Sequence, residues 1–138
     1  HVYVEKPMAI KMSDLEEIKA QINNSSTKQV LMTGFNRRFS THSKLFKRAF
    51  ETNDFKAINI TVNAGAIPDT HWIHDPAIGG GRLVGEACHF VDLARFIVQS
   101  PISKMQTMNS SADIQDSYLV SMSFENGSVA NINYFTKI

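Results

Sequence analysis

Residues 79–99, GGGRLVGEACHFVDLARFIVQ, contain the most informative element of the chain. From Leu83 to Gln99 apolar side chains recur at helical spacing, and Ser100-Pro101 ends the predicted helix. One arc carries Leu83, Val84, Ala87, Phe90, Val91, Ala94, Ile97 and Val98, and the opposite arc carries Arg82, Gly85, Glu86, His89 and Asp92. Leu93 and Phe96 interrupt the polar arc, so we expect another part of the molecule to cover some of it.

The polar arc permits two interpretations, and so do the glycines before it. The arc is either a solvent-exposed face or one side of a functional site. Gly79-Gly80-Gly81 forms either a flexible turn or a place where another backbone or a ligand approaches the helix N-terminus.

The segment before this region has the pattern of a βαβ unit. His1–Val4 and Val30–Phe35 are predicted strands. Ser13 is the predicted N-cap of a helix that runs to Ile22, with Glu16 in capping-box register. Short connections between these elements favour parallel strands with a right-handed crossover.

From Ser40 onward the pattern indicates a second architecture. A predicted amphipathic helix ends near Glu51, and an irregular stretch occupies 64–81. The predicted strands are Ala57–Val62, Ile102–Met108, Tyr118–Phe124 and Ser128–Phe135. Glu125-Asn126-Gly127 predicts a hairpin turn between the last two. The fold class is therefore an α/β tail followed by an α+β domain with a mainly antiparallel open sheet.

Composition restricts the class of protein. The chain has 138 residues, 43% of them hydrophobic, which is enough for a globular core. A net charge of +1 gives no electrostatic reason to expect nucleic acid or a membrane as a partner. The single cysteine, Cys88, fits a reducing compartment, so we expect a cytoplasmic protein. The sequence opens at His1 directly in a strand-like run, and we interpret it as a fragment of a longer protein.

Three other groups are candidates for chemistry. Lys6 follows a strand at the end where α/β proteins bind ligands, although an isolated lysine is more often solvated. Asn36-Arg37-Arg38 follows the second strand and suits either a phosphate or carboxylate site or a basic surface turn. His71 and His74 lack a third ligand at a diagnostic spacing, so we predict no metal site.

Three motifs occur in an order that resembles one family. Val2–Pro7, VYVEKP, is similar to the EKP segment of the Gfo/Idh/MocA oxidoreductases. Gly34–Phe39, GFNRRF, resembles the last strand of their nucleotide domain and its exit. A third block consists of Trp72, Asp75-Pro76, Gly79–Gly81 and His89–Leu93. The resemblance covers nearly the whole chain and is closest to bacterial members linked to sugar or surface-polysaccharide metabolism.

The resemblance implies a two-domain enzyme. Residues 1–36 would be the C-terminal part of a Rossmann nucleotide-binding domain. Residues 37–138 would belong to the substrate and oligomerisation domain, whose open sheet packs against another subunit in a homo-oligomer such as a dimer. The cofactor would be NAD or NADP. The chain contains no G-x-G-x-x-G, so the main cofactor motif would lie outside it and the isolated fragment would be inactive.

Site residues follow from the same resemblance. His89 would be the general base in hydride exchange with a sugar- or cyclitol-like alcohol. Lys6 would orient the hydroxyl, in a turn whose Lys6–Pro7 bond is cis, and Asp92 would orient His89. The implied cofactor contacts are Glu5, Lys6, Pro7, Asn36 and Arg38, and the implied substrate contacts are Trp72, His74 and Arg82.

Two positions depart from the family pattern. The usual Asp four residues before the His is Gly85, and Ile73 stands where many members have Arg. Glu86 is either a catalytic substitute for that Asp or a charge that favours the helix N-terminus. The rival to a dehydrogenase is a non-catalytic sugar-binding or dimerising relative with a decayed site. A hydrolase or dehydratase that uses nicotinamide transiently is a third possibility.

Overall fold

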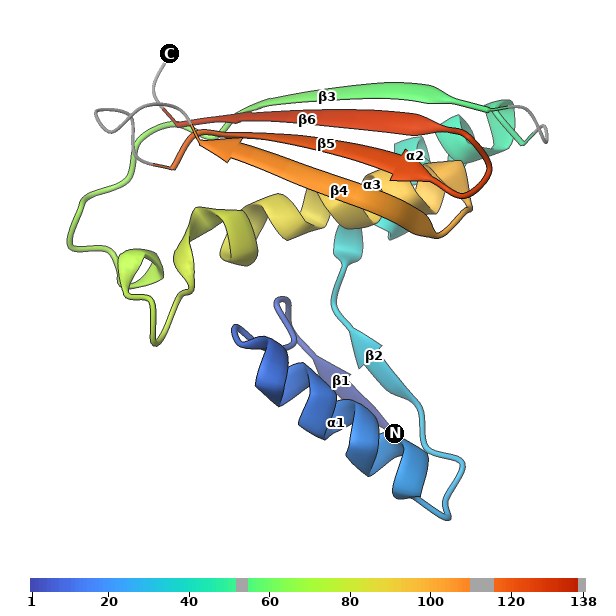
Figure 1. The fold of residues 1–138 in the computed structure, drawn as a ribbon, viewed down its shortest axis with the longest axis vertical. Coiled ribbons are helices and arrows are strands. Elements are labelled where there is room, and N and C mark those ends of the chain that lie inside the picture. The colour runs from blue at the N-terminus through green and yellow to red at the C-terminus, as the bar shows by residue number, and fades with distance from the viewer. Residues whose placement is uncertain (52–54, 110–115, 137–138) are drawn as a thin grey trace.

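The computed structural model describes residues 1–51, 55–109 and 116–136, which form a βαβ unit and a helix-backed sheet (Figure 1). The βαβ unit consists of β1 (Val2–Val4), α1 (Met12–Asn24) and β2 (Leu31–Thr33). β1 and β2 pair in parallel, with Val2 opposite Leu31, which confirms the predicted strand direction. The predicted cap at Ser13 is wrong. The helix already begins at Met12, and the Ser13 hydroxyl donates to Asp14 within the first turn.

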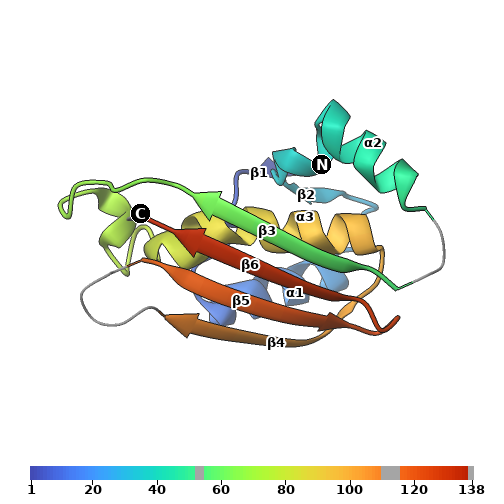
Figure 2. The same cartoon turned by 90° about the horizontal axis from the view of Figure 1, so that it is seen from above.

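A four-stranded sheet forms the second part. Its strands are β3 (Ala57–Asn63), β4 (Ile102–Asn109), β5 (Tyr118–Phe124) and β6 (Val129–Phe135), in the order β3-β6-β5-β4 (Figure 2). The predicted hairpin joins β5 and β6, and β4 pairs antiparallel with β5. β3 instead pairs in parallel with β6, so the sheet is mixed. Nothing local in the sequence specifies this pair, because its two strands are far apart along the chain.

The hydrophobic core lies between this sheet and the long helix. The helix has two parts, a π-helical turn at Leu83–Ala87 and α3 at Cys88–Val98. Alternate residues of β5 and β6 face it, and the buried cluster is Ala87, Phe90, Ala94, Val98, Val120, Met122, Phe124, Ala130, Ile132 and Tyr134. From Ala87 onward, the predicted apolar arc is therefore the core-facing side, whereas Val84 lies outside this cluster. In Figure 1 α3 lies between the sheet and the βαβ unit.

The opposite side of α3 is covered, as Leu93 and Phe96 indicate. A 3-10 turn at Asn36–Phe39 leads from β2 into α2 (Thr41–Ala49), and both contact α3. Arg38 and Lys47 lie over the Phe96 ring, at 5.6 and 4.6 Å from its centroid. No helix within the described ranges is long and apolar enough to cross a membrane.

Candidate active site

Lys6 reaches the π-helical turn of the long helix. It follows β1 in a loop whose Lys6–Pro7 bond is cis, as the family resemblance predicted. Its Nζ donates a hydrogen bond to the Gly85 carbonyl at 2.5 Å. Lys6 is half-buried, so it is not the freely solvated lysine of the simpler interpretation. The contact joins the βαβ unit to the beginning of the helix that carries His89.

The π-helical turn changes which side chains share a face. Its i→i+5 pairing puts more residues into a turn than an α-helix has, so the faces inferred from α-helical spacing do not apply before Cys88. Gly85 is buried, and a Cβ there would lie 3.0 Å from Ile73 Cδ1 and 3.4 Å from the Gly79 carbonyl oxygen. A carboxylate at position 85 would therefore begin against Ile73.

His89 lies just beyond this turn, in the first turn of α3. Phe35 contacts its ring edge-on, with 6.3 Å between centroids. Its Nδ1 is buried, and no described hydrogen-bond partner reaches it. Burial lowers the pKa of the imidazole, and the charges of Lys6 and Arg37 lower it further. The neutral form, which accepts a proton, is therefore favoured.

Asp92 binds Arg38, whereas the resemblance implied that it orients His89. Its carboxylate is buried and binds the Arg38 guanidinium at two points, with Arg38 Nε 2.9 Å from Oδ2 and Nη2 bonded to Oδ1. No described hydrogen bond joins it to His89, and its effect on that imidazole is electrostatic, raising its pKa. The Asn36–Arg38 segment was predicted to suit a phosphate or a carboxylate, and the carboxylate that Arg38 binds is that of Asp92 in the same chain.

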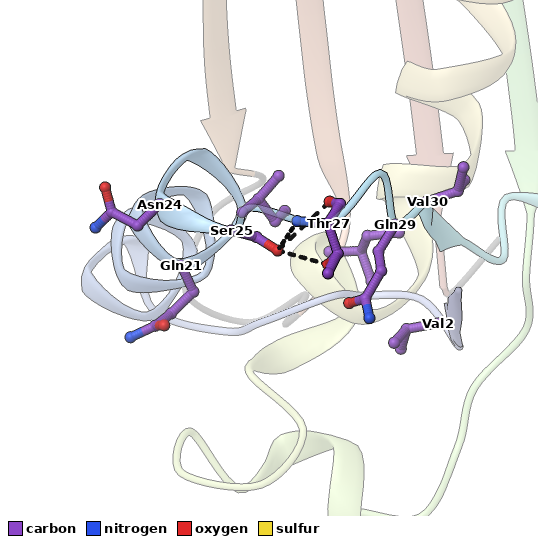
Figure 3. A pocket seen from close by; sticks show the side chains of 9 residues that line it. Val2, Gln21, Asn24, Ser25, Thr27, Gln29 and Val30 are labelled. Carbon is purple, nitrogen blue, oxygen red and sulfur yellow. Dashed lines mark hydrogen bonds between the residues drawn. The ribbon is translucent and has the colours of Figure 1, made fainter.

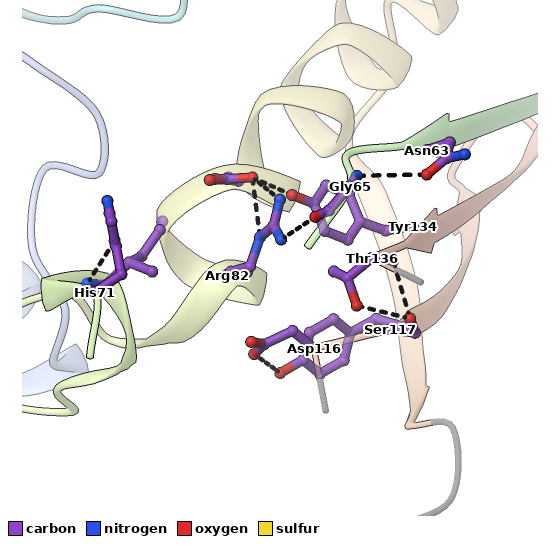
Figure 4. A network of polar contacts seen from close by, with 12 residues as sticks. Asn63, Gly65, His71, Arg82, Asp116, Ser117, Tyr134 and Thr136 are labelled. Carbon is purple, nitrogen blue, oxygen red and sulfur yellow. Dashed lines mark hydrogen bonds and ion pairs between the residues drawn. The ribbon is translucent and has the colours of Figure 1, made fainter. Parts of the chain in front are cut away.

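Glu86 and Arg82 belong to one internal network, of which Figure 4 labels Arg82, Gly65 and Tyr134. Arg82 is 2% exposed, and its guanidinium donates to the Gly65 carbonyl at 2.7 Å and to Glu86 at 3.0 and 3.3 Å. The Tyr134 hydroxyl also donates to Glu86. Burial would raise the pKa of Glu86, but the bonds from Tyr134 and Arg82 outweigh it and hold that pKa below its ordinary value. These bonds engage the predicted catalytic carboxylate of Glu86 and the predicted substrate-binding guanidinium of Arg82 inside the protein.

The glycine-rich loop is held by Asp75. Its carbonyl accepts the backbone N–H groups of Ile78, Gly79 and Gly80, and its carboxylate accepts that of Ala77. Gly79 packs against the Ile73 main chain, where a Cβ would collide. Gly79 therefore permits the close approach of another backbone segment, whereas a Cβ at Gly80 would meet the Ile10 side chain.

The predicted substrate contacts Trp72 and His74 flank Ile73 in a short 3-10 turn. Trp72 is 60% exposed and stacks on His71, with 5.4 Å between centroids. His74 Nδ1 pairs with Asp116 at 3.0 Å. Ile73 is buried against Gly85, so this turn lies beside the π-helical turn.

The remaining candidates lie at the strand ends of the βαβ unit. Asn36 is exposed, and Glu5 is exposed and accepts a hydrogen bond from Tyr3.

Cys88 lines a pocket of about 430 Å³ between α3 and β4, and burial raises its thiol pKa, so it is not an activated nucleophile.

A separate pocket of about 420 Å³ lies at the far end of the βαβ unit (Figure 3). Its lining includes Val2, Gln21, Thr27 and Val30. This is the end where β1 and β2 begin, whereas Lys6 and Asn36 follow the ends of these strands. Ligands of open α/β sheets bind at the carboxyl ends of the strands, so we do not assign this pocket to the site.

Sequence reasoning did not find three residues of the site. Tyr134 belongs to a predicted strand, and only its place beside the helix makes it a partner of Glu86. Arg37, predicted only as part of a basic segment, lies 4.4 Å from the Phe90 ring centroid, next to His89. For Ile73, the one indication in the sequence was that it stands where many family members have Arg.

Comparison with known proteins gives consistent matches. Residues 52–137 match the GFO/IDH/MocA C-terminal domain. An uncharacterized oxidoreductase of Bacillus subtilis, YrbE, is 25% identical over 96% of this chain and 41% of its own length. The myo-inositol 2-dehydrogenase of Thermotoga maritima is 28% identical over 76% of this chain and 31% of its own length.

A solved dehydrogenase structure also aligns with this chain. The WlbA dehydrogenase of Chromobacterium violaceum, in complex with NADH and UDP-GlcNAcA, is 25% identical and aligns with a TM-score of 0.75 over 99% of this chain and 42% of its own. The chain thus spans 41% or less of the two curated relatives.

Proposed function

The chain belongs to the Gfo/Idh/MocA family, and from that membership we propose that the complete protein transfers hydride between NAD(P) and a sugar- or cyclitol-like alcohol. The named relatives support the substrate class, because one acts on myo-inositol and another was solved with NADH and a nucleotide sugar. The family match covers the C-terminal domain, so the activity is proposed for the whole protein.

The observation that carries the proposal is the contact between Lys6 and the π-helical turn next to His89. The 2.5 Å bond to Gly85 holds a cation close enough to lower the pKa of His89. A positioned ammonium and a neutral imidazole are the two groups needed to bind a hydroxyl and remove its proton.

Each of the two side chains has a distinct role. Gly85 occupies one N–H of Lys6, which leaves the ammonium able to donate to a substrate oxygen and to stabilise negative charge as the proton leaves. His89 takes that proton. The nicotinamide, when bound, accepts or supplies the hydride.

The other candidate residues fall into two groups, according to whether their side chains form bonds inside the protein. Glu5, Pro7 and Asn36 remain proposed cofactor contacts, and Trp72 and His74 remain proposed substrate contacts. Arg38, Arg82, Glu86 and Asp92 are engaged in internal bonds, and we give them supporting roles. The donor set near His89 fits the nicotinamide end of the cofactor, whereas the motif for its phosphates lies outside this chain.

The domain assignment is also a proposal. Residues 1–36 are the C-terminal part of a Rossmann domain, and residues 37–138 belong to a substrate and oligomerisation domain. The parallel β1–β2 pair and the separate four-stranded sheet support this division. The outer face of the sheet, where Asn131 bonds Asn59 and Ser121, is the proposed surface for a second subunit. The single cysteine supports a cytoplasmic location.

A non-catalytic relative is the second candidate, and the internal bonds of Asp92 and Glu86 favour it, because they leave the site without an unengaged carboxylate at these two positions. Kinetics separate the two. The complete protein would be assayed for NAD⁺ and NADP⁺ reduction with myo-inositol and UDP-GlcNAcA. His89→Ala and Lys6→Ala should each lower turnover about 10²–10⁴-fold. His42→Ala and Lys28→Ala, at exposed positions away from the outer face of the sheet, are the matched controls. Equal turnover in all four variants would favour the non-catalytic candidate.

A further inference from the structure

We propose that Arg82, Glu86 and Tyr134 are positioning residues that hold the π-helical turn in the shape that presents the Gly85 carbonyl to Lys6. The inference rests on the proposed function. It gives Glu86 a role other than acid or base.

The three side chains connect separate parts of the domain. Arg82 precedes the π-helical turn and also binds the carbonyl of Gly65, in the loop after β3 (Figure 4). Tyr134 belongs to β6 and is 1% exposed, so its ring position is fixed by the core. Its hydroxyl and the Arg82 guanidinium both donate to the same Glu86 oxygen. The guanidinium carbon also lies 5.4 Å from the Tyr134 ring centroid.

This arrangement fixes the residue next to the one that Lys6 contacts. Glu86 is covalently adjacent to Gly85, within the same π-helical turn. A side chain held at position 86 by two residues, Arg82 and Tyr134, restricts the rotation of the peptide before it, which carries the Gly85 carbonyl. Gly85 has no side chain of its own to anchor, and Ile73 fills the space beside it. The Gly85 carbonyl is therefore held in place through the adjacent residue, Glu86.

The network is also linked electrostatically to the site. Burial alone would raise the pKa of Glu86, but the hydrogen bonds from Tyr134 and Arg82 lower it, and the charge of Lys6 lowers it further. Lys6 meets a neutral carbonyl, so its ammonium has no bonded counter-ion among the described residues. Precise placement of this cation through a backbone carbonyl needs a rigid turn, and the network supplies that rigidity.

Four variants of the complete enzyme test the proposal. Glu86→Leu removes the acceptor, Tyr134→Phe removes one donor and keeps the ring, and Glu86→Gln keeps an acceptor oxygen but no charge. Thr136→Val is the matched control, since it removes a buried hydroxyl that bonds Ser117 near the end of β6. Steady-state kinetics with both substrates and the melting temperature would be measured for each.

A positioning role gives a specific pattern. Glu86→Leu and Tyr134→Phe should lower kcat about 10- to 100-fold, because misplacement of a catalytic group by about 1 Å costs this much, with KM for the cofactor within about twofold. Glu86→Gln should stay within about threefold of wild type, because Tyr134 still has an oxygen to bind. Thr136→Val should lower the melting temperature and leave kcat unchanged.

Three other patterns overturn the proposal. A Glu86→Gln variant as impaired as Glu86→Leu would make the carboxylate itself catalytic. Losses of kcat that follow melting temperature in all four variants, Thr136→Val included, would reduce the network to fold stability. Near-wild-type kcat in Tyr134→Phe and Glu86→Leu would leave the turn independent of the network, and Tyr134→Phe keeps this outcome accessible even if Glu86→Leu does not fold. If Lys6→Ala and His89→Ala also keep full turnover, it is the proposed function that fails.

Discussion

Arg38, at the exit of β2, binds the buried carboxylate of Asp92 at two points and so ties the βαβ unit to the helix that carries His89. Two parallel bonds fix the orientation of both groups, which one bond would not do. The pair lies one helical turn beyond His89, and the Gly85–Lys6 bond lies about one turn before it. His89 is therefore held in place by contacts on both sides along the helix.

Removing Arg38 should destabilise the protein more than removing an exposed arginine. Arg38→Gln leaves the Asp92 carboxylate buried without its charged partner, at an expected cost of about 2 kcal/mol in the free energy of unfolding. Urea denaturation would measure it, with Arg48→Gln on α2 as the exposed control. An Arg38→Gln/Asp92→Asn double variant should recover part of the loss, because the buried charge is then absent. Equal stability of Arg38→Gln and Arg48→Gln would contradict the prediction.

The activity of the complete enzyme should persist below the ordinary pKa of histidine. Burial and the charges of Lys6 and Arg37 lower the pKa of His89, so the base stays neutral to a lower pH. The acidic limb of kcat/KM should therefore lie below pH of about 6.5. Arg37→Gln removes one of the positive charges and should move that limb to higher pH.

Arg48→Gln is the matched control for this shift, because Arg48 is exposed on α2 and is not among the charges that act on His89. A limb that stays in place in Arg37→Gln, or moves equally in both variants, would show that Arg37 does not act on the catalytic base.

Restoring the family's aspartate should fail. Gly85→Asp places a Cβ 3.0 Å from Ile73 Cδ1 and directs the new carboxylate toward an apolar side chain and the Gly79 carbonyl. The variant should lose about 1–3 kcal/mol of stability through overpacking and gain no turnover. Gly85→Ala, which has the Cβ without the charge, separates the steric cost from the electrostatic one. Higher turnover in Gly85→Asp than in wild type would mean that the turn rearranges to admit the carboxylate.

Features set by local pattern were predictable from the sequence. The apolar arc with Ala87, Phe90 and Ala94 marks the core face of the helix, and Glu125-Asn126-Gly127 marks the β5–β6 hairpin. Both signals come from residues close together in the chain. The family motifs led to Lys6 and His89, which the fold brings close to the same turn.

Features set by distant packing were not predictable. The π-helical turn follows no sequence period, and α-helical spacing therefore put Glu86 on the His89 face, whereas its carboxylate binds Arg82 and Tyr134. The parallel β3–β6 pair depends on where the chain re-enters the sheet after α3. The pairing of Arg38 with Asp92 links residues that only the folded chain brings together.

The isolated chain should bind nicotinamide cofactor weakly. A Rossmann domain holds the pyrophosphate at the glycine-rich turn between its first strand and helix, and residues 1–138 contain no such motif. After β2, Arg38 is neutralised by Asp92. Arg37 is exposed, but one cation does not replace a turn of backbone N–H groups. Calorimetry with NADH should show a Kd no tighter than about millimolar for residues 1–138, consistent with contacts from the nicotinamide end alone. The complete protein, measured under the same conditions, is the control and should bind at least about 100-fold more tightly. Micromolar binding by the isolated chain would mean that the cofactor's phosphates are held by residues 1–138 themselves, and the division of the site between this chain and the rest of the protein would be wrong.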